Sequence, residues 1–480
     1  MLNKVRNILW ILSISSLLLF GCKKDELIGN QAPETKLSVD SINLTGNNRL
    51  NSTIRLSWYG TDIDGYVTNY EYSINNGDWI ATNIQDSTFK FSIDAGSDTT
   101  DILFKVRAID DKGVKDPTPA MVSIPLKNAP PQVTIEQESF PIDTTNLALT
   151  FRWRYADPDG DNTVTKAFIK VNAGSWIEIE RNKSLITLIA TNTKNVGTGD
   201  AQLYYNVDNN PSAVAINSFN NGGNNTIYLK VLDIAGSESK IDTSKMVFVK
   251  PQTSDMLFLN GQNATIANAY QNLISKAGKS YDYIDLGAGG GKYLPRFWNP
   301  TYRLLTSKYK LLFINSDQGL FTNTANGNAG LLLEFLAPVL QNFTDNGGKS
   351  FITTSFPSGY DLVNIKGAFP IDSISNTSGQ AVVASDSNIY NPTGLMPTLS
   401  PKNLVLGVDP FVPSVDALVI YRARTSAFGA WKGPNVVGVK RMVAGKARQV
   451  FFSVELHLFN ADNTKLENLF SYIFNTELND

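Results

Sequence analysis

Cysteine and histidine are almost absent from this chain. Its 480 residues include one cysteine, Cys22, and one histidine, His457. A single cysteine excludes an internal disulfide and any metal site built from several thiolates. Stability must therefore come from side-chain packing, for which 42% hydrophobic and 10% aromatic residues supply the material.

The chain also has little net charge and no long hydrophobic run. There are 42 basic and 44 acidic side chains, which gives a net charge of -2. Nucleic-acid binding requires a clustered basic surface, so we expect no nucleic-acid partner. The apolar run at residues 8–20 is 13 residues long and contains three serines, whereas a membrane-spanning helix needs about 20 apolar residues.

That short run has the form of an export signal. Lys4 and Arg6 precede it, and residues 19–22 (Leu-Phe-Gly-Cys) resemble the lipobox of a bacterial lipoprotein. The resemblance implies that residues 1–21 are a cleaved signal peptide and that Cys22 is acylated and anchors the protein to a membrane. The alternative is a cysteine that stands at the end of an ordinary secretory signal by accident.

The residues that follow Cys22 refine this location. Residues 23–26 (Lys-Lys-Asp-Glu) resemble the surface-export signal of Bacteroidota lipoproteins. We therefore predict a lipid-anchored protein of the outer membrane that faces the cell exterior, with residues 22–31 as the lipidated tether. The alternatives are a plain solvated tether and a placement that faces the periplasm.

Two related segments follow the tether. Residues 56–65 align with residues 151–160, which places Trp58 and Trp153 at the same position. Residues 104–110 and 228–233 align later, with the period of two that a half-buried strand requires. The pattern resembles fibronectin type III-like and immunoglobulin-like modules, which serve as spacers or binding platforms. We place module 1 at residues 32–126 and module 2 at 127–251, with a long Asn/Gly-rich loop at 217–225.

An acidic turn in module 2 suggests a metal. Asp157, Asp159 and Asp161 alternate around Gly160. Three carboxylates on one tight loop repel each other unless a cation lies between them, and Ca²⁺ takes such oxygen ligands. A structural Ca²⁺ is the only cofactor that we predict. The alternative is turn chemistry, because Asp and Gly favour turns by themselves.

The pattern changes after Pro251. Short apolar runs at residues 256–259, 309–315 and 351–354 alternate with helical patterns at 264–277 and from about residue 330. Further strands are expected at 417–421, 435–440 and 449–454, and a helix at 465–475. Alternating strands and helices predict an α/β domain with a mostly parallel sheet at residues 252–480. The fold class is therefore a multidomain protein with two all-β sandwich modules followed by this domain.

Residues 309–317, 343–355 and 445–454 resemble class I glutamine amidotransferase-like, flavodoxin-like domains. Enzymes of that family use a Cys nucleophile after a central strand and a His-x-Glu pair on a later strand. This chain has no Cys at residues 355–359, and residues 455–457 read Glu-Leu-His, in reversed order. We therefore predict no enzymatic activity. Ser355 or Ser358 paired with His457 would be needed for an atypical serine hydrolase.

Aromatic residues suggest a binding surface. Ligands favour the carboxyl edge of the strands in open α/β sheets, and aromatic rings in loops there could stack on sugar rings. The candidates are Tyr293, Phe297, Trp298, Tyr302 and, on the same rim, Trp431. The alternative is that these rings only pack against the domain.

Together these features favour a non-catalytic surface lipoprotein whose α/β domain binds a glycan, a peptide or a partner protein. One alternative is an accessory subunit of an outer-membrane uptake or secretion complex, in which an outer-membrane protein is the partner. The other is the atypical serine hydrolase.

Overall fold

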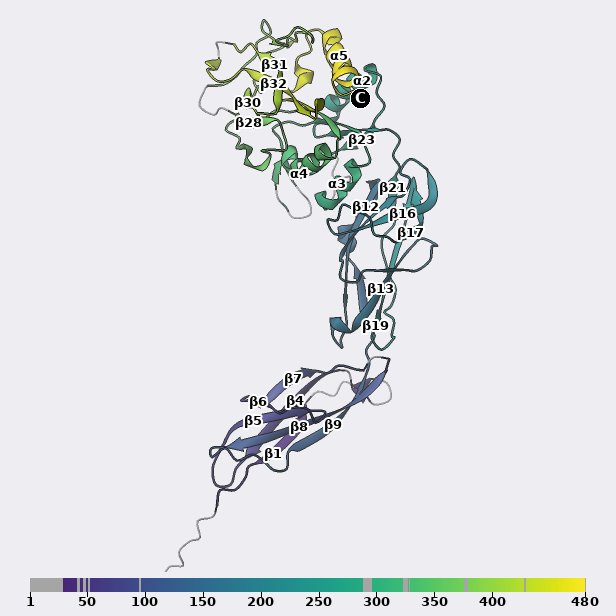
Figure 1. Cartoon of the computed structure of the whole chain (residues 1–480), viewed down its shortest axis with the longest axis vertical. Coiled ribbons are helices and arrows are strands. Elements are labelled where there is room, and N and C mark those ends of the chain that lie inside the picture. The colour runs from purple at the N-terminus through teal and green to yellow at the C-terminus, as the bar shows by residue number, and fades with distance from the viewer. Residues whose placement is uncertain are drawn as a thin grey trace, which may run out of the picture. The chain divides into compact units, whose positions relative to one another are not determined.

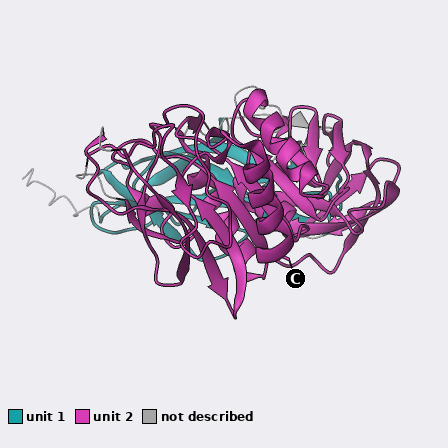
Figure 2. Ribbon diagram, turned by 90° about the horizontal axis from the view of Figure 1, so that it is seen from above, with its two compact units in different colours: residues 1–131, 156–165, 232–238 teal, residues 132–155, 166–231, 239–480 magenta. Residues whose placement is uncertain are grey.

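The computed structural model describes residues 29–40, 44–45, 49–50, 52–94, 96–287, 296–322, 327, 329–374, 379–426 and 429–479 (Figure 1). The predicted signal peptide, Cys22, residues 23–26 and Tyr293 lie outside this range. The chain divides into two compact units, residues 1–131, 156–165 and 232–238, and residues 132–155, 166–231 and 239–480 (Figure 2). In the described part of the chain, no helix has both the length and the apolar character needed to cross a membrane.

Module 1 is a β-sandwich, as predicted. One sheet has the order β1 (Glu34–Val39), β4 (Thr53–Thr61) and β7 (Asp86–Lys90). The other has the order β2 (Leu44–Thr45), β3 (Arg49–Leu50), β9 (Ala120–Lys127), β8 (Thr99–Asp110), β5 (Val67–Ile74) and β6 (Ile80–Thr82). Trp58 of β4 and Phe104 of β8 are buried in one core cluster, so the two sheets face each other with immunoglobulin-like connections.

Module 2 repeats this plan with more strands. One sheet has the order β10 (Gln132–Ile135), β12 (Ala148–Ala156), β15 (Leu185–Ala190), β16 (Gly197–Tyr205) and β17 (Ala215–Asn221). The second has the order β14 (Ile177–Ile179), β13 (Val164–Val171), β19 (Ile227–Asp233) and β20 (Asp242–Thr243). A third, small sheet has the order β11 (Thr144–Asn146), β21 (Val247–Lys250) and β18 (Gly223–Asn225).

The long loop predicted at residues 217–225 is wrong, because β17 and β18 occupy most of it. Asparagine side chains hold these strands in place. Asn221 Nδ2 donates to the carbonyls of Thr193 (2.8 Å) and Asn195 (2.7 Å), and Asn225 Oδ1 accepts the Asn220 N–H (2.8 Å). Asparagine is depleted in strands in general, so the composition of this segment suggested a loop. In the structure, hydrogen bonds of the asparagine side chains hold the strands in place.

The α/β domain has a mixed sheet. Five strands run parallel in the order β23 (Asp282–Asp285), β22 (Met256–Asn260), β24 (Leu311–Asn315), β27 (Lys349–Thr353) and β33 (Lys446–Phe452). The sheet then continues through antiparallel pairs with β32 (Val436–Val443), β30 (Phe411–Pro413) and β28 (Ile371–Ile374), while β31 (Ala417–Ala423) pairs with β32 and β29 (Ile389–Tyr390). A separate hairpin joins β25 (Leu320–Thr322) and β26 (Ala329–Leu331).

The prediction of a mostly parallel sheet is therefore confirmed only in part. β32 and β33 form a hairpin whose last paired residues are Val443 and Lys446. Ala444 and Gly445 form the turn with φ values of 51° and 77°. A two-residue turn with positive φ at both positions joins antiparallel strands, whereas a parallel pair needs a crossover of a dozen or more residues.

Helices cover both faces of this sheet (Figure 1). On one face α2 (Ala264–Lys276) and α5 (Asn463–Tyr472) pack on Phe258, Phe313 and Phe351. On the other face α3 (Trp298–Thr306) and α4 (Leu332–Asp345) pack on the alternate strand residues. Short 3₁₀ turns lie at Gln137–Ser139, Asp161–Thr163, Leu362–Asn364 and Leu456–Leu458, and a π-helical turn at Ile473–Glu477.

Module 2 and the α/β domain share a hydrophobic core. Leu147, Ile189 and Tyr204 of module 2 belong to the same buried cluster as Leu305 of α3. Arg303 of α3 also donates to the carbonyls of Val207 (2.6 Å) and Asp208 (3.1 Å). Through these contacts the hydrophobic cores of module 2 and the α/β domain form one continuous core.

Candidate functional site

The carboxyl ends of four parallel strands meet at one edge of the α/β sheet. Along the chain β22 comes first, and the next two strands pair with opposite sides of it, β23 on one and β24 on the other. Such a reversal of strand order opens a crevice outside the carboxyl ends, where ligands of open α/β sheets bind. The polar residues that follow β22, β24, β27 and β33 therefore form the candidate site.

These residues form one hydrogen-bonded network. Gln262, two residues after β22, donates from Nε2 to Glu455 Oε2 (2.7 Å), and Asn315 Nδ2 donates to Gln262 Oε1 (3.2 Å). Ser355, two residues after β27, donates from Oγ to Glu455 Oε1 (2.8 Å). Glu455 thus accepts a hydrogen bond on each carboxylate oxygen, which fixes its orientation.

Charge in this network is costly because water is largely excluded. Burial raises the pKa of Glu455, hydrogen bonds from Ser355 and Gln262 lower it, and the nearby charge of Asp317 raises it again. Burial also lowers the pKa of His457 to about 4, against a smaller opposing effect of Asp317. The imidazole is therefore neutral at pH 7.

The structure brings Ser355 and His457 to the same edge but does not pair them. Ser355 is 1% exposed and its hydroxyl is committed to Glu455. His457 Nδ1 lies 3.3 Å from the Tyr270 hydroxyl and 3.8 Å from Glu455 Oε2. The carboxylate thus occupies the place beside the serine where a serine hydrolase needs its base.

An open cavity of about 580 Å³, which we call the crevice, adjoins this network. This volume is within the range of ligand sites, about 300–1,000 Å³. Its polar and aromatic lining includes Gln318, Phe356, Ser358, Gln380, Asp409 and Trp431. Ser358, one of the two serines that an atypical serine hydrolase would need, lies exposed on its wall.

Asp409 is the carboxylate of the crevice. Its Oδ2 accepts the backbone N–H of Phe356 at 2.8 Å. Burial raises the pKa of Asp409 to about 7, the Phe356 hydrogen bond lowers it, and the charge of Glu455 raises it. Near neutral pH this side chain can therefore either donate or accept a hydrogen bond.

Trp431 is the aromatic ring of the crevice, and it is held in one orientation. Its indole Nε1 donates to the Pro434 carbonyl at 2.6 Å. The ring lies against Gly433, where an added Cβ would meet the ring at 2.5 Å. Gln380 N donates to the Gly429 carbonyl (2.9 Å), which ties the preceding segment to the wall of the crevice. The ring is a fixed platform whose own N–H is already used.

The other described aromatic candidates have a packing role, the alternative considered above. Trp298 is 8% exposed and Tyr302 is 2% exposed, and both belong to the core under α3 and α4. Phe297 lies 4.9 Å from the guanidinium of Arg152. A ligand-stacking role is therefore wrong for Trp298 and Tyr302, because their rings are covered.

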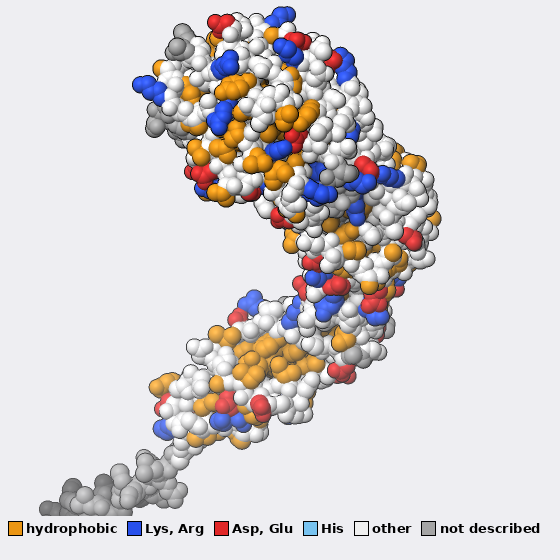
Figure 3. All heavy atoms as spheres, turned by 45° about the horizontal axis from the view of Figure 1, so that its top comes forward, with side chains coloured by type: hydrophobic (Ala, Val, Ile, Leu, Met, Phe, Trp, Pro, Cys, Tyr) orange, Lys and Arg blue, Asp and Glu red, His pale blue; other side chains and the backbone are white. Residues whose placement is uncertain are grey.

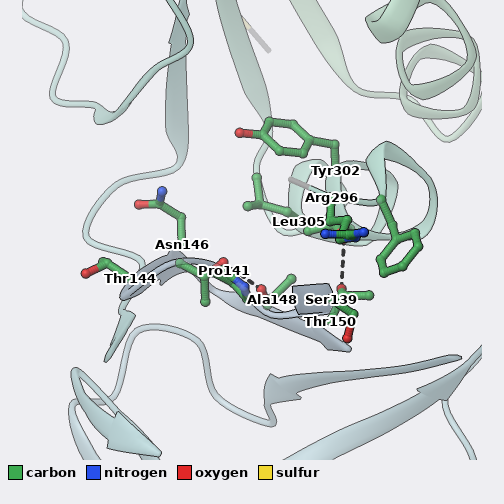
Figure 4. Close-up of a pocket in the computed structure, with 12 residues that line it drawn as sticks. Ser139, Pro141, Thr144, Asn146, Ala148, Thr150, Arg296, Tyr302 and Leu305 are labelled. Atoms are coloured by element: carbon green, nitrogen blue, oxygen red, sulfur yellow. Dashed lines mark hydrogen bonds between the residues drawn. The ribbon is translucent and has the colours of Figure 1, made fainter. Parts of the chain in front are cut away.

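A second cavity lies beside these rings, between α3 and module 2 (Figure 4). Arg296, Phe297 and Tyr302 line one side of it, and Thr144 and Thr150 line the other. Its volume is about 20 Å³, which is close to the space of one water molecule, about 10–15 Å³. It is too small for a sugar ring.

The acidic turn of module 2 is closed by protein donors. Asp157 accepts the Asp159 N–H (2.8 Å) and the Thr163 hydroxyl (2.7 Å). Asp161 accepts the Asp157 N–H (3.0 Å), and Asp159 accepts the Ala129 N–H (2.8 Å). The described residues contain no group of three or more His, Cys, Asp or Glu side chains that could hold a metal ion. These contacts give each of the three carboxylates a protein donor, as turn chemistry predicts.

Sequence reasoning missed two residues of this site. Gln262 follows a predicted strand, so its position at the carboxyl edge could have been found by counting from the strand end. Asp409 has no such signal, because its place depends on an isolated bridge between Val408 and Val454.

On the face shown in Figure 3, basic and acidic side chains are interspersed, so the local lining indicates the ligand better than the surface charge does.

No family model matches the chain, and no curated protein matches it. Solved structures give distant likenesses. Fibronectin(III)-like modules of Clostridium thermocellum CbhA are 15% identical, with a TM-score of 0.18, over 45% of this chain and 94% of theirs. A two-domain fibronectin type III segment of chicken tenascin is 10% identical, with a TM-score of 0.23, over 45% and 99%. Agd3, a carbohydrate deacetylase, is 9% identical, with a TM-score of 0.27, over 46% and 32%. TM-scores this low carry no argument about function.

Proposed function

We propose that the protein is a binding protein, anchored at the outer membrane through Cys22, whose α/β domain holds a neutral glycan in the crevice. The observation that carries the proposal is the fixed Trp431 ring facing the same cavity as Asp409. A flat aromatic surface packs against the C–H face of a sugar ring, while a carboxyl group bonds its hydroxyls. The two side chains together match a ligand that is apolar on its faces and polar at its edges.

The lining favours a neutral ligand over an anionic one. None of the described residues that line the crevice is Lys or Arg. Asp409 lies in the wall, and the charge of Glu455 acts on it from nearby. A phosphate or carboxylate ligand would meet like charge without a compensating cation. Gln318, Ser358 and Gln380 add neutral donors and acceptors.

The network at the sheet edge supports binding without turnover. Ser355 is buried and hydrogen-bonded to Glu455, and His457 lies against Tyr270. A serine nucleophile needs a base that accepts its proton, together with an exposed position from which it can attack. Ser355 has the carboxylate but is not exposed, and the exposed Ser358 is not the residue that Glu455 contacts.

Calorimetric titration with a panel of neutral oligosaccharides tests this proposal. The protein expressed from residue 23 retains every residue that the structure describes. Trp431→Ala should weaken binding by about 30-fold, or about 2 kcal/mol, as loss of a buried aromatic contact does. Tyr66→Ala is the matched control, because Tyr66 is an exposed ring of module 1.

Two results would contradict the proposal. Equal affinities of the wild type and the Trp431→Ala variant would remove the crevice as the binding site. Reproducible hydrolysis of an ester group on a bound saccharide that is lost in the Ser358→Ala variant would show that the protein is an enzyme.

A further inference from the structure

The wall of the crevice contains an exposed leucine that a plain glucan would not need. Leu406 lines the cavity and is 52% exposed. A glucan carries hydroxyl groups around the edge of each ring, so it has no apolar group there to cover a leucine. Covering apolar surface is favourable, at about 25 cal/mol per Å². The wall therefore matches a ligand that carries an apolar group beside its hydroxyl groups.

The backbone holds Leu406 in place on both sides. Val405 N donates to the Val383 carbonyl (2.9 Å), and Val383 N donates to the Val405 carbonyl (3.0 Å). On the other side Val408 forms an antiparallel bridge with Val454. Val405 and Val408 are both buried. The leucine surface is therefore in position before a ligand arrives, which lowers the cost of ordering it on binding.

Leu404, two residues earlier, provides an internal reference. It is 49% exposed, almost as much as Leu406, but it does not line the crevice. Single exposed leucines are common on protein surfaces and need no ligand to explain them. Leu406 differs because it lies in the wall of the cavity of about 580 Å³ that Trp431 also lines.

Two glutamine side chains add polar groups of a fitting kind. Gln318 and Gln380 line the same cavity, and both are exposed. Each side-chain amide can donate and accept a hydrogen bond. An acetamido group has one N–H donor, one carbonyl acceptor and one methyl group. The glutamine amides can pair with the first two, and Leu406 can cover the third.

We propose that the crevice selects glycans that carry N-acetyl groups on their sugar rings. This inference rests on the proposed function, because it names the class of saccharide that the same site holds. The ring would lie on Trp431 with a hydroxyl group on Asp409, while its acetamido methyl group packs on Leu406. An N-acetyl group is uncharged, which agrees with the lack of Lys and Arg among the described lining residues.

Calorimetric titration with chitotetraose and cellotetraose tests this inference on the protein expressed from residue 23. The two ligands have the same backbone of β-linked rings and differ only in their acetamido groups. The wild type should bind chitotetraose about tenfold more tightly, because one methyl group is buried and one amide hydrogen bond is formed. N-acetylgalactosamine and galactose give the same comparison for the epimeric ring.

A pair of leucine variants locates the preference. Leu406→Ser should narrow the ratio of the two affinities to about twofold, because the methyl group loses its apolar contact. Leu404→Ser is the matched control and should keep the tenfold ratio, since Leu404 does not line the crevice. Both leucines are about half exposed, so neither substitution should affect folding.

The possible outcomes separate this inference from the proposed function. Equal affinities within both ligand pairs, each weakened by Trp431→Ala, would overturn the inference and leave the proposed function in place. Binding of no saccharide in the neutral panel would overturn both.

Two further results would overturn the inference alone. An unchanged tenfold preference in Leu406→Ser would show that the acetyl group is recognised elsewhere. Cellotetraose with O-acetyl esters that binds as tightly as chitotetraose would show that any acyl group is accepted and that the amide has no role.

Discussion

The substitution Asp409→Asn tests whether the crevice carries a buried carboxyl group. Asn has almost the same shape, and its amide oxygen can still accept the Phe356 N–H that Asp409 Oδ2 accepts at 2.8 Å. What changes is the ability to carry a negative charge. Burial raises the pKa of Asp409 to about 7 from its ordinary value of 3.8.

The sign of the effect follows from where the proton is bound. Between the unfolded value of 3.8 and the folded value of about 7, the folded chain holds a proton that the unfolded chain has released. The contribution of Asp409 to the free energy of unfolding is therefore present at low pH and falls as the pH rises toward 7. One proton gives a slope of about 1.4 kcal/mol per pH unit, which flattens as Asp409 ionises in the folded chain, so the loss between pH 5 and pH 7 is roughly 2 kcal/mol.

Urea denaturation at several pH values, followed by tryptophan fluorescence, measures this difference. The stability of Asp409→Asn relative to the wild type should rise by roughly 2 kcal/mol from pH 5 to pH 7 and level off above about pH 8. Titrating groups that do not interact with Asp409 cancel, because both proteins contain them. Asp386→Asn is the control, since Asp386 is an exposed carboxylate of the same domain. A relative stability that is equal at pH 5 and pH 8 would refute the reasoning, because Asp409 would then titrate as an exposed group does.

Three other changes have defined outcomes. Gly433→Ala should weaken saccharide binding although residue 433 does not line the crevice, because the added Cβ would displace the Trp431 ring. Unchanged affinity in calorimetry would contradict the fixed orientation of that ring. Arg303→Ala should lower the free energy of unfolding by about 2 kcal/mol, because two carbonyls lose their buried donor. In calorimetric scans it should separate the melting of module 2 from that of the α/β domain. A single unshifted transition would contradict the shared core. Cys22→Ala should move the protein from the membrane to the soluble fraction of lysed cells; retention at the membrane would contradict the lipid anchor.

The buried strands and long helices of the α/β domain could be predicted from sequence. The apolar run at 256–259 became β22, and the pattern at 264–277 became α2, because hydrophobic periodicity follows burial directly. The direction of β32 could not be predicted in this way. It depends on the turn at Ala444 and Gly445, where both φ angles are positive. Hydrophobic periodicity says nothing about these angles.

The candidate site could be predicted only where chain position determines it. Ser355, Glu455 and His457 follow the strands predicted at 351–354 and 449–454, so their place at one rim can be deduced from the sequence. Which side chain faces which depends on packing, and Glu455, not His457, reached the serine. Asp409 and Trp431 come together through loops that sequence patterns do not place. Trp298 and Tyr302 were expected in a loop but belong to α3.

A crystal structure of the protein with a bound neutral oligosaccharide is the most direct test of the central claim. A sugar ring should lie flat on Trp431, with a hydroxyl group within hydrogen-bond distance of the Asp409 carboxyl group. A saccharide bound away from the crevice, or none at concentrations that saturate binding in solution, would contradict it.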